Sequence, residues 1–546
     1  MPAHQIDLIL FNGRVHTMDA ALPFATAVAV SGERIAAVGT DKEIQTLGHP
    51  GTLIIDLRGR TLVPGFIDAH IHFATWALHR QHLDLSDAPA LEEILARVAA
   101  RAKETPPGTW ILGDGFDPNA WSDASWPTRQ MLDAVAPKHP VLLHSKDHHS
   151  IWVNSLALQL AGVTRETPDP PGGRILRDPA TGEPTGFLSE AATGLVKRVV
   201  PRPTVEQLVA ALREAQPFAW QAGLTGIHEA GDHKEMSALR AFQILRHSGE
   251  LGLRVVQYIP AAQLDTFVQA GVQSGFGDEW LRIGGVKFFM DGALGSRTAL
   301  MLQPYEDEPD NHGVAVIEKE EMWERALQAS RAGLALCVHA IGDRANRDIL
   351  DVLEAVREEE RAEGRPVLRH RIEHVQVLHP DDLPRLARLD VIASMQPIHA
   401  TSDMVMAERH WGRERCRLAY AWRSLLNVGT HLAFGSDAPV EPFDVMAGIY
   451  AAVTRRRPDG APGPSGWQPQ ERITREEALR AYTLGPAYAA GEEGIKGSIT
   501  PGKLADMVVL SQDILTCPAE EILSTRIEAT IVGGRIVYRD PEAAIG

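Results

Sequence analysis

Residues 62–72 read Leu-Val-Pro-Gly-Phe-Ile-Asp-Ala-His-Ile-His. The run is typical of a short apolar strand that ends in two histidines separated by one residue. Residues i and i+2 of a strand point to the same face, so His70 and His72 can present two imidazoles to one metal ion. An isolated pair of this kind is more often two histidines in structural hydrogen bonds. Here, further residues of ligand type follow along the chain.

Four later apolar runs each carry such a residue at or just after their C-terminal end, and these residues are Lys287, His339, His374 and Asp437. Neutral imidazoles and a carboxylate suit zinc or another borderline divalent ion. A protonated lysine cannot bind a cation, so Lys287 is the exception in this set. The pattern predicts a metal site assembled from the ends of several strands.

The alternation of apolar strands with helices predicts the α/β class and a (β/α)8 TIM-type barrel, with its active site at the C-terminal ends of the strands. Helices are expected at residues 91–102, 318–332 and 344–360. The expected barrel strands, in chain order, are residues 62–72, 141–144, 224–228, 283–289, 335–339, 370–374, 391–395 and 431–434.

Both ends of the chain carry short strands and turns without long helices. Neither end has enough surface to bury its own core. We therefore expect residues 1–61 and 498–546 to form one composite β-sandwich domain. Residues 62–497 are expected to form the hydrolase barrel, with an insertion at about 78–215.

Four longer motifs are specific for a known group of proteins. They lie at residues 108–113 (Gly-Thr-Trp-Ile-Leu-Gly), 287–297, 339–345 and 497–506. Together with the ligand-type residues, they resemble the amidohydrolase superfamily and, within it, the YtcJ-like group, which includes N-substituted formamide deformylases. The resemblance covers nearly the whole chain and says little about the substrate.

The resemblance implies that Lys287 is carboxylated by CO2 and bridges two metal ions; the alternative is a mononuclear site with unmodified Lys287. In the binuclear arrangement His70 and His72 hold one ion with Asp437, and His339 and His374 hold the other. Zinc is the expected metal, at one or two ions per chain, with Mn²⁺, Co²⁺ or Fe²⁺ as alternatives. Metal-bound hydroxide would attack a carbonyl, while Asp437 takes the proton and returns it to the leaving nitrogen.

Several further residues are candidates for catalysis or substrate binding. His149 could polarise the carbonyl or protonate the leaving group, or be a surface histidine. Arg297 could clamp a substrate carboxylate, or equally pin its loop to a carboxylate of the protein. His399 could line the pocket or be structural. Trp76 could form part of an apolar wall, although single tryptophans are more often core residues.

The composition favours a globular protein with a small-molecule substrate. A formal charge of −17 argues against nucleic acid or an anionic membrane as a partner. No run approaches the ~20 apolar residues of a membrane span, and no N-terminal signal is visible, so a cytoplasmic location is expected. A homodimer is the expected assembly. The arginines at residues 455–457 are predicted to be a solvated face.

The sequence thus predicts a metal-dependent hydrolase that cleaves a non-peptide carbon–nitrogen bond, in an amide or an N-substituted formamide. The alternatives are a cyclic amide or carbamate hydrolase, or a deaminase, working with the same site. A catalytically silent metal-binding regulatory protein is the alternative from another class, and the complete ligand set argues against it.

Overall fold

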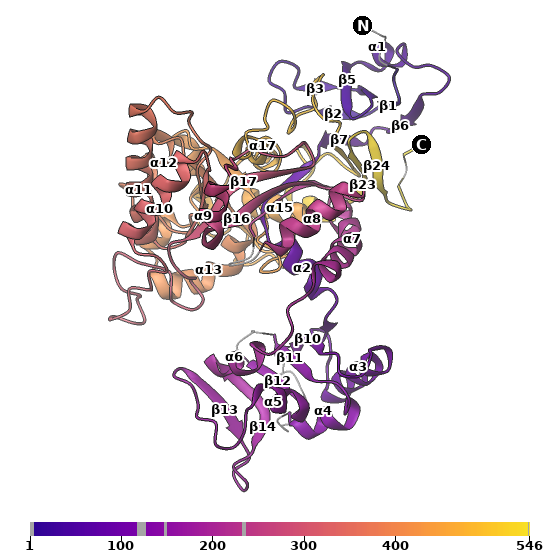
Figure 1. Cartoon of the computed structure of the whole chain (residues 1–546). Helices are drawn as coiled ribbons and strands as arrows, with labels where there is room; N and C mark the ends of the chain where they lie inside the picture. The colour runs from indigo at the N-terminus through magenta and orange to yellow at the C-terminus, as the bar shows by residue number, and fades with distance from the viewer. Residues whose placement is uncertain (1–4, 117–126, 147–149, 232–235, 544) are drawn as a thin grey trace. The chain divides into compact units, whose positions relative to one another are not determined.

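The computed structural model describes residues 5–116, 127–146, 150–231, 236–543 and 545–546 (Figure 1). The chain divides into two compact units, Met1–Ala74 with Leu212–Gly546, and Thr75–Ala211. In the part of the chain that the structure describes, no helix combines the length and the apolar character needed to cross a membrane.

The first unit contains an eight-stranded sheet in which all neighbouring pairs are parallel. In order across the sheet, its strands are β8 (Phe66–Ile71), β15 (Leu224–Glu229), β16 (Arg254–Pro260), β17 (Leu281–Phe289), β18 (Leu336–Ala340), β19 (Arg371–His374), β20 (Ile392–Met395) and β21 (Leu432–Phe434). The two edge strands also meet, since the backbone N–H of Asp437, just after β21, donates to the carbonyl of His70 in β8 over 2.7 Å. The sheet is therefore a nearly closed barrel of the TIM type.

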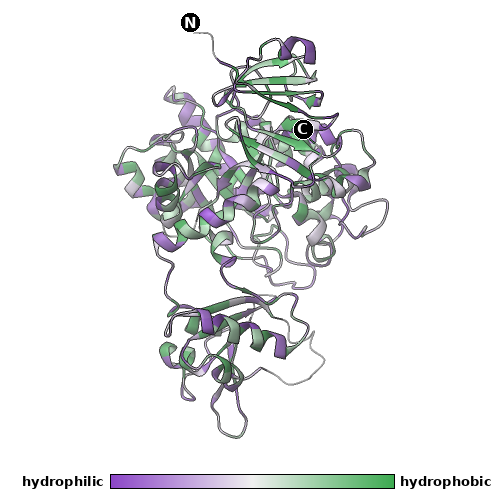
Figure 2. Cartoon of the chain, turned by 90° about the vertical axis from the view of Figure 1, so that its right-hand side faces the viewer, coloured by the Kyte–Doolittle hydropathy of each residue, from purple (hydrophilic) through white to green (hydrophobic). Residues whose placement is uncertain are grey.

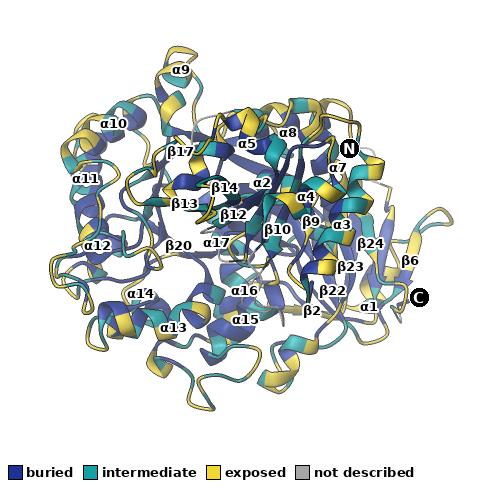
Figure 3. Ribbon diagram, turned by 90° about the horizontal axis from the view of Figure 1, so that it is seen from below, coloured by how far each residue is buried: buried dark blue, intermediate teal, exposed yellow. Residues whose placement is uncertain are grey.

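Helices alternate with these strands. They include α7 (Val205–Gln221), α8 (Ser237–His247), α9 (Leu264–Gln269), α10 (Lys319–Arg331), α11 (Asp343–Ala362), α12 (Leu383–Arg388), α13 (Pro397–Trp411), α14 (Trp422–Asn427), α15 (Val445–Thr454), α16 (Arg475–Ala481) and α17 (Leu484–Ala489). In α11 the apolar residues Ile349, Leu353 and Val356 recur at helical spacing and are fully buried. Figure 3 shows the same alternation of buried and exposed residues along α10 and α11.

The prediction of the barrel strands is confirmed for the last five, and residues 224–228 also form a barrel strand, although the second and not the third. Of residues 62–72, only the part in β8 lies in the barrel, since residues 61–64 form a strand of another sheet. The prediction was wrong for residues 141–144, which belong to β11 (Val141–Ser145) in the sheet of the second unit. The third barrel strand is β16, where no strand was predicted. Strand β11 pairs in parallel with β10 (Ile111–Phe116), so its apolar run has the local character of a barrel strand. Strand β16 instead carries the buried polar residues Arg254 and Gln257, which obscure its pattern.

Strands from both ends of the chain pair in one six-stranded sheet. Its order is β24 (Arg535–Arg539), β23 (Ile527–Val532), β22 (Met507–Leu510), β7 (Thr61–Pro64), β2 (Arg14–His16) and β3 (Phe24–Ala25). A four-stranded sheet contains β5 (Arg34–Gly39), β4 (Ala27–Ser31), β1 (Leu8–Phe11) and β6 (Leu53–Asp56). Strands of these sheets appear largely in green in the hydropathy colouring of Figure 2.

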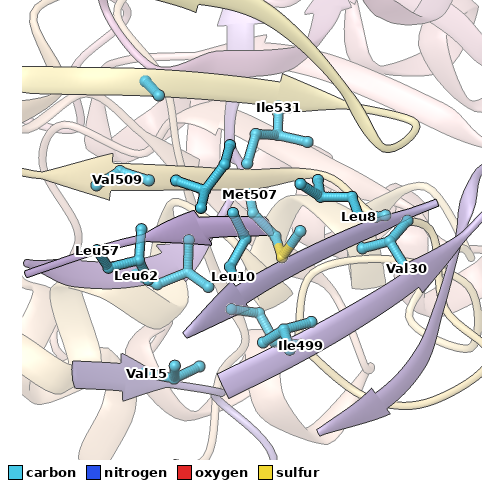
Figure 4. Packing of buried hydrophobic residues seen from close by; sticks show 14 of the residues in the cluster. Leu8, Leu10, Val15, Val30, Leu57, Leu62, Ile499, Met507, Val509 and Ile531 are labelled. Atoms are coloured by element: carbon cyan, nitrogen blue, oxygen red, sulfur yellow. The ribbon is translucent and has the colours of Figure 1, made fainter. Parts of the chain in front are cut away.

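One hydrophobic cluster contains residues of both sheets. Leu8, Leu10 and Val30 come from the four-stranded sheet, and Met507 and Val509 from the six-stranded one (Figure 4). All are nearly inaccessible to solvent, so the two ends of the chain share an apolar core. That they form a separate sandwich domain, with the boundaries given above, stays a prediction.

The second unit has its own sheet. Its order is β13 (Gly173–Arg177), β14 (Pro184–Glu190), β12 (Ser150–Val153), β11, β10 and β9 (Leu83–Asp84). Among the described residues, the α-helices that lie wholly within this unit are α3 (Leu91–Glu104), α4 (Arg129–Val135), α5 (Ser155–Ala161) and α6 (Gly194–Lys197). Two hydrophobic clusters lie wholly within this unit. The helix predicted at residues 91–102 is confirmed as α3.

Candidate metal centre and active site

The six residues predicted as metal ligands all line one cavity of about 340 Å³. The cavity lies at the C-terminal ends of the barrel strands, where β8, β17, β18, β19 and β21 deliver these side chains. The residues lining it are His70, His72, Lys287, Phe289, Ala293, Leu294, Gly295, His339, Ile341, His374, Gln376, His399, Asp403, Asp437, Val440 and Glu441.

Three of these residues converge closely enough to hold one cation. Ligand atoms of His70, His374 and Asp437 all lie within 4.8 Å of one another, and all three residues are buried. His72 approaches the same carboxylate, with 3.4 Å between its Nε2 and Oδ1 of Asp437. Two or three imidazoles with one carboxylate are a donor set of the kind that binds zinc.

His339 and Lys287 complete the predicted set. The ring centroids of His339 and His374 are 4.5 Å apart. The Nζ of Lys287 is buried and has no hydrogen-bond partner among the residues that the structure describes. It lies 4.9 Å from the ring centroid of Phe289. Burying an amine without a hydrogen-bond partner is costly, so this nitrogen is a candidate for modification or for contact with a further group.

The backbone around the centre is strained at two of its members. His374 has a φ of 75° and Asp437 a φ of 62°, both in the left-handed region that residues other than glycine rarely adopt. Next to Asp437, a Cβ on Gly435 would meet the backbone nitrogen of His70 at 2.4 Å. Glycine is therefore required at 435, because β21 approaches β8 so closely there. Strain of this kind concentrates at functional sites.

Most of the nitrogen donors are neutral imidazoles at pH 7, the form that binds a metal ion. Burial, assisted by the nearby charge of Lys287, lowers the pKa of His70 to about 4 and that of His339 to about 3. Burial also holds the pKa of His374 well below its ordinary value. His72 is the exception: burial is the largest single effect and lowers its pKa, but the hydrogen bond to Asp437 together with the charges of Asp437 and Glu229 raises the pKa above its ordinary value.

The carboxylate of Asp437 is ionised at neutral pH. Burial alone would raise its pKa, but the hydrogen bond from His72 and the charge of that ring hold the pKa well below its ordinary value. A neutral imidazole and an ionised carboxylate are the forms that ligate metals.

A buried ion pair supports the centre from inside the barrel. Glu373 accepts a hydrogen bond from Nδ1 of His70 and is paired with Arg371 through two further contacts. Arg371 also donates to the carbonyl of Ala69 and to the hydroxyl of Ser394. Sequence reasoning missed this pair, although two charged residues at i and i+2 in a buried strand are a signal that could have revealed it.

Of the residues predicted to act on or bind substrate, His399 lines the cavity, whereas Arg297 and Trp76 are not among the residues that line it. His399 lines the cavity, with its Nε2 3.8 Å from Oδ2 of Asp437 and its ring stacked on that of His374. Arg297 forms ion pairs with Asp307 at 2.9 Å and Glu308 at 3.3 Å, which corresponds to the loop-pinning alternative.

Trp76 lies in α2 (Phe73–His79), within the second unit, where the guanidinium of Arg80 stacks on it at 5.2 Å. His149 lies outside the described residues, and β11, the strand before it, is not a barrel strand.

The prediction for residues 455–457 was wrong at Arg455, which is fully buried. Its guanidinium lies over the rings of Trp422 and Trp467 and donates to the carbonyl of Tyr420 over 2.9 Å. Arg456 and Arg457 are partly exposed. Three arginines in a row gave no periodic signal that one of them turns inward.

Comparison with known proteins identifies related chains. Residues 53–538 match the Amidohydrolase family. The chain is 34% identical to the "Putative amidohydrolase YtcJ" of Bacillus subtilis, covering 97% of this chain and 99% of that protein. It is 32% identical to the "N-substituted formamide deformylase" of Arthrobacter pascens, over 97% of this chain and 98% of that one.

Among solved structures, one similar to this chain is an uncharacterized metal-dependent hydrolase from Pyrococcus furiosus. The TM-score is 0.79 and the sequence identity 30%, over 93% of this chain and 100% of that chain.

Proposed function

The chain belongs to the amidohydrolase family of metal-dependent hydrolases, and we propose that it cleaves a non-peptide carbon–nitrogen bond, in an N-substituted formamide or another amide. The observation that carries the proposal is the convergence of His70, His374 and Asp437 at the mouth of the barrel. The similarity to an N-substituted formamide deformylase over nearly the whole length of both chains supports the choice of substrate.

The donor set fits zinc, and we propose that His70, His72, His374 and Asp437, with His339, hold one or two ions. When bound, a divalent ion supplies a Lewis acid for the carbonyl and lowers the pKa of water toward about 7. We further propose that Lys287 carries a carboxylate derived from CO2. Its buried Nζ without a partner supports this, because a carbamate would replace an uncompensated ammonium with an anion.

The protein residues then have separate tasks. Asp437 is buried and ionised, and it accepts the proton of the attacking water and returns it to the leaving nitrogen. His399, 3.8 Å from the same carboxylate, is placed to hydrogen-bond the substrate. Phe289, Leu294 and Ile341 exclude water from the apolar part of the cavity.

The terminal sheets carry none of the residues that line the cavity. We infer that residues 1–61 and 498–546 form a β-sandwich whose part is to stabilise the barrel. The shared hydrophobic cluster supports this inference.

The test is a screen of formamides, other amides and carbamates with zinc-, manganese- and cobalt-loaded protein, with elemental analysis of each sample. Asp437→Asn should lower kcat for any substrate found by about 10²-fold or more, because an amide cannot accept the proton. Asp381→Asn is the matched control, since that carboxylate is 82% exposed. Wild-type kcat in Asp437→Asn would contradict the assignment of the base.

A further inference from the structure

A carboxylate on the wall of the cavity has no part in the chemistry described so far. Asp403 and His399 both lie on α13 and both line the cavity. They are four residues apart, so they share one face of the helix, and Asp403 lies one turn, about 6 Å, further along it. His399 approaches Asp437, and Asp403 is offset from His399 by about one helical turn along the same wall of the cavity.

Buried neighbours fix the side chain of Asp403 in place. Its Oδ2 accepts a hydrogen bond of 2.6 Å from the hydroxyl of Tyr420. Tyr420 is buried, and its carbonyl accepts from Arg455, which is enclosed by tryptophans. The Tyr420 ring also packs edge-on against Trp467, with centroids 5.9 Å apart. A carboxylate fixed in this way is preorganised for binding, because little side-chain entropy remains to be lost.

Burial raises the pKa of Asp403 above its ordinary value, against the opposing effects of His399 and of the Tyr420 hydroxyl. Among the residues that the structure describes, no lysine or arginine lies within ion-pair distance of Asp403. Glu441, a second carboxylate at the cavity, likewise forms no ion pair in the described part of the chain. The other lining residues near the mouth include the apolar side chains Phe289, Leu294 and Val440. The cavity thus combines an apolar wall with two carboxylates, Asp403 and Glu441, to which a cationic group of a substrate could bind.

We propose that Asp403 is a specificity-determining residue that binds a protonated amine on the substrate. This rests on the proposed function and narrows it to amides of aminoalkyl amines, in which an apolar chain of about four carbons separates the hydrolysed amide from an ammonium. The chain length follows from the offset of about one helical turn between His399, beside Asp437, and Asp403. An ammonium donates three hydrogen bonds and is charged at neutral pH, so it matches an oxygen of Asp403 facing the cavity.

The test uses two formamides of nearly equal size. N-(4-aminobutyl)formamide ends in an ammonium, and N-pentylformamide has a methyl group in its place. With zinc-loaded wild-type protein, kcat/KM should be at least about 10-fold higher for the ammonium compound, since a charge-assisted hydrogen bond distinguishes the two. In Asp403→Asn the ratio should fall to about 1, and kcat/KM for N-pentylformamide should change less than about 2-fold.

Two further variants separate local from general effects. Tyr420→Phe removes the hydroxyl that holds Asp403 and should reduce the preference without abolishing it. Asp381→Asn, the exposed carboxylate, should keep the wild-type ratio. Equal kcat/KM for both formamides in the wild type, or an unchanged ratio in Asp403→Asn, would overturn the proposal while leaving the hydrolase assignment intact.

Binding without hydrolysis distinguishes failure of the subsite from failure of the proposed function. Calorimetric titration with 1,4-diaminobutane should show binding to the wild type that is at least about 10-fold weaker in Asp403→Asn. If neither formamide is hydrolysed but this difference is observed, the subsite stands and the formamide assignment fails. If the wild type and Asp403→Asn bind the diamine equally, the subsite is refuted whatever the hydrolysis data show.

Discussion

Each imidazole of the candidate metal centre is oriented by a second polar group. The carboxylate of Glu373 holds His70, and the side-chain oxygen of Gln396 lies 2.8 Å from Nδ1 of His374. Backbone carbonyls of Gly231 and Gly292 lie 3.1 Å and 2.9 Å from ring nitrogens of His72 and His339, respectively. Such contacts fix the tautomer and the ring orientation, and so leave the opposite nitrogen of each ring for a ligand.

Gln396 offers the cleanest test of this orientation, because it carries no charge. Gln396→Leu should weaken zinc affinity about 10- to 100-fold, since His374 loses the acceptor that orients it. Competition with a chromophoric chelator measures the dissociation constant. Gln396→Glu retains an acceptor oxygen and serves as the control, with affinity within a few-fold of wild type. Wild-type affinity in Gln396→Leu would show that backbone conformation alone orients the ring.

The metal ligands could be predicted from the sequence, but the residues that orient them and the residues that line the rest of the cavity could not. His70, His339, His374 and Asp437 stand at the ends of apolar runs, where their chemistry is conspicuous. Asp403 stands within a helix, and its role depends on which face of α13 turns toward the cavity. Gln396 and Tyr420 become visible only when the strand ends are brought together in space.

At the scale of elements, some barrel strands can be predicted from the sequence and others cannot. The last five strands could be predicted because each is an apolar run bounded by turns or helices. Strand β16 could not, because Arg254 at its start is buried against Asp506 through contacts of 2.6 and 3.1 Å, a pairing 252 residues apart in sequence. Strand β11 was misplaced because local pattern cannot distinguish one parallel sheet from another.

An ion pair between Arg423 and Glu477 links helices α14 and α16, and its contribution to the free energy of unfolding depends on pH. Glu477 accepts from Arg423 and caps the start of α16 through Thr474. The Arg423 guanidinium, with these capping bonds, lowers the pKa of Glu477 from 4.5 to about 2. Because the pKa of Glu477 is lower in the folded state, the ionised carboxylate stabilises the folded protein at pH values above its unfolded pKa of 4.5. This stabilisation is lost as the pH falls from 4.5 toward 2.

Glu477→Gln should therefore lower the free energy of unfolding by about 1–2 kcal/mol at pH 7, a value reduced for the partial exposure of the pair. The difference from wild type should shrink as pH falls from 5 toward 2. Urea denaturation at several pH values measures it. Glu476→Gln is the control, because in the described part of the chain Glu476 forms only an exposed i,i+4 pair with Arg480. A difference that does not change with pH would refute the account of the Glu477 pKa.

At the scale of the whole molecule, the two ends of the chain depend on each other. Strand β7 lies between β2 and β22, so it pairs with the N-terminal segment on one side and the C-terminal segment on the other. Strand β7 ends two residues before β8, the strand that leads to His70. The sequence could predict that both termini carry strands, but their pairing depends on contacts more than 400 residues apart.

Removal of residues 505–546 should make the protein insoluble rather than only inactive. The deletion takes away β22, β23 and β24, and so exposes both an unpaired edge of β7 and the apolar residues Leu8, Leu10 and Leu62. The soluble fraction after expression, compared with the full-length chain, measures the effect. A soluble truncated protein that unfolds cooperatively at the wild-type temperature would contradict it.

The central claim is that the cavity at the mouth of the barrel holds a metal on which hydrolysis depends. The most direct measurement is the rate of N-pentylformamide hydrolysis by chelator-treated protein as zinc is added back. The rate should be lost on chelation and return with added zinc, reaching a plateau at one or two equivalents per chain, whereas Asp437→Asn should stay inactive at every ratio. Full activity in protein shown by elemental analysis to be free of metal would contradict the claim.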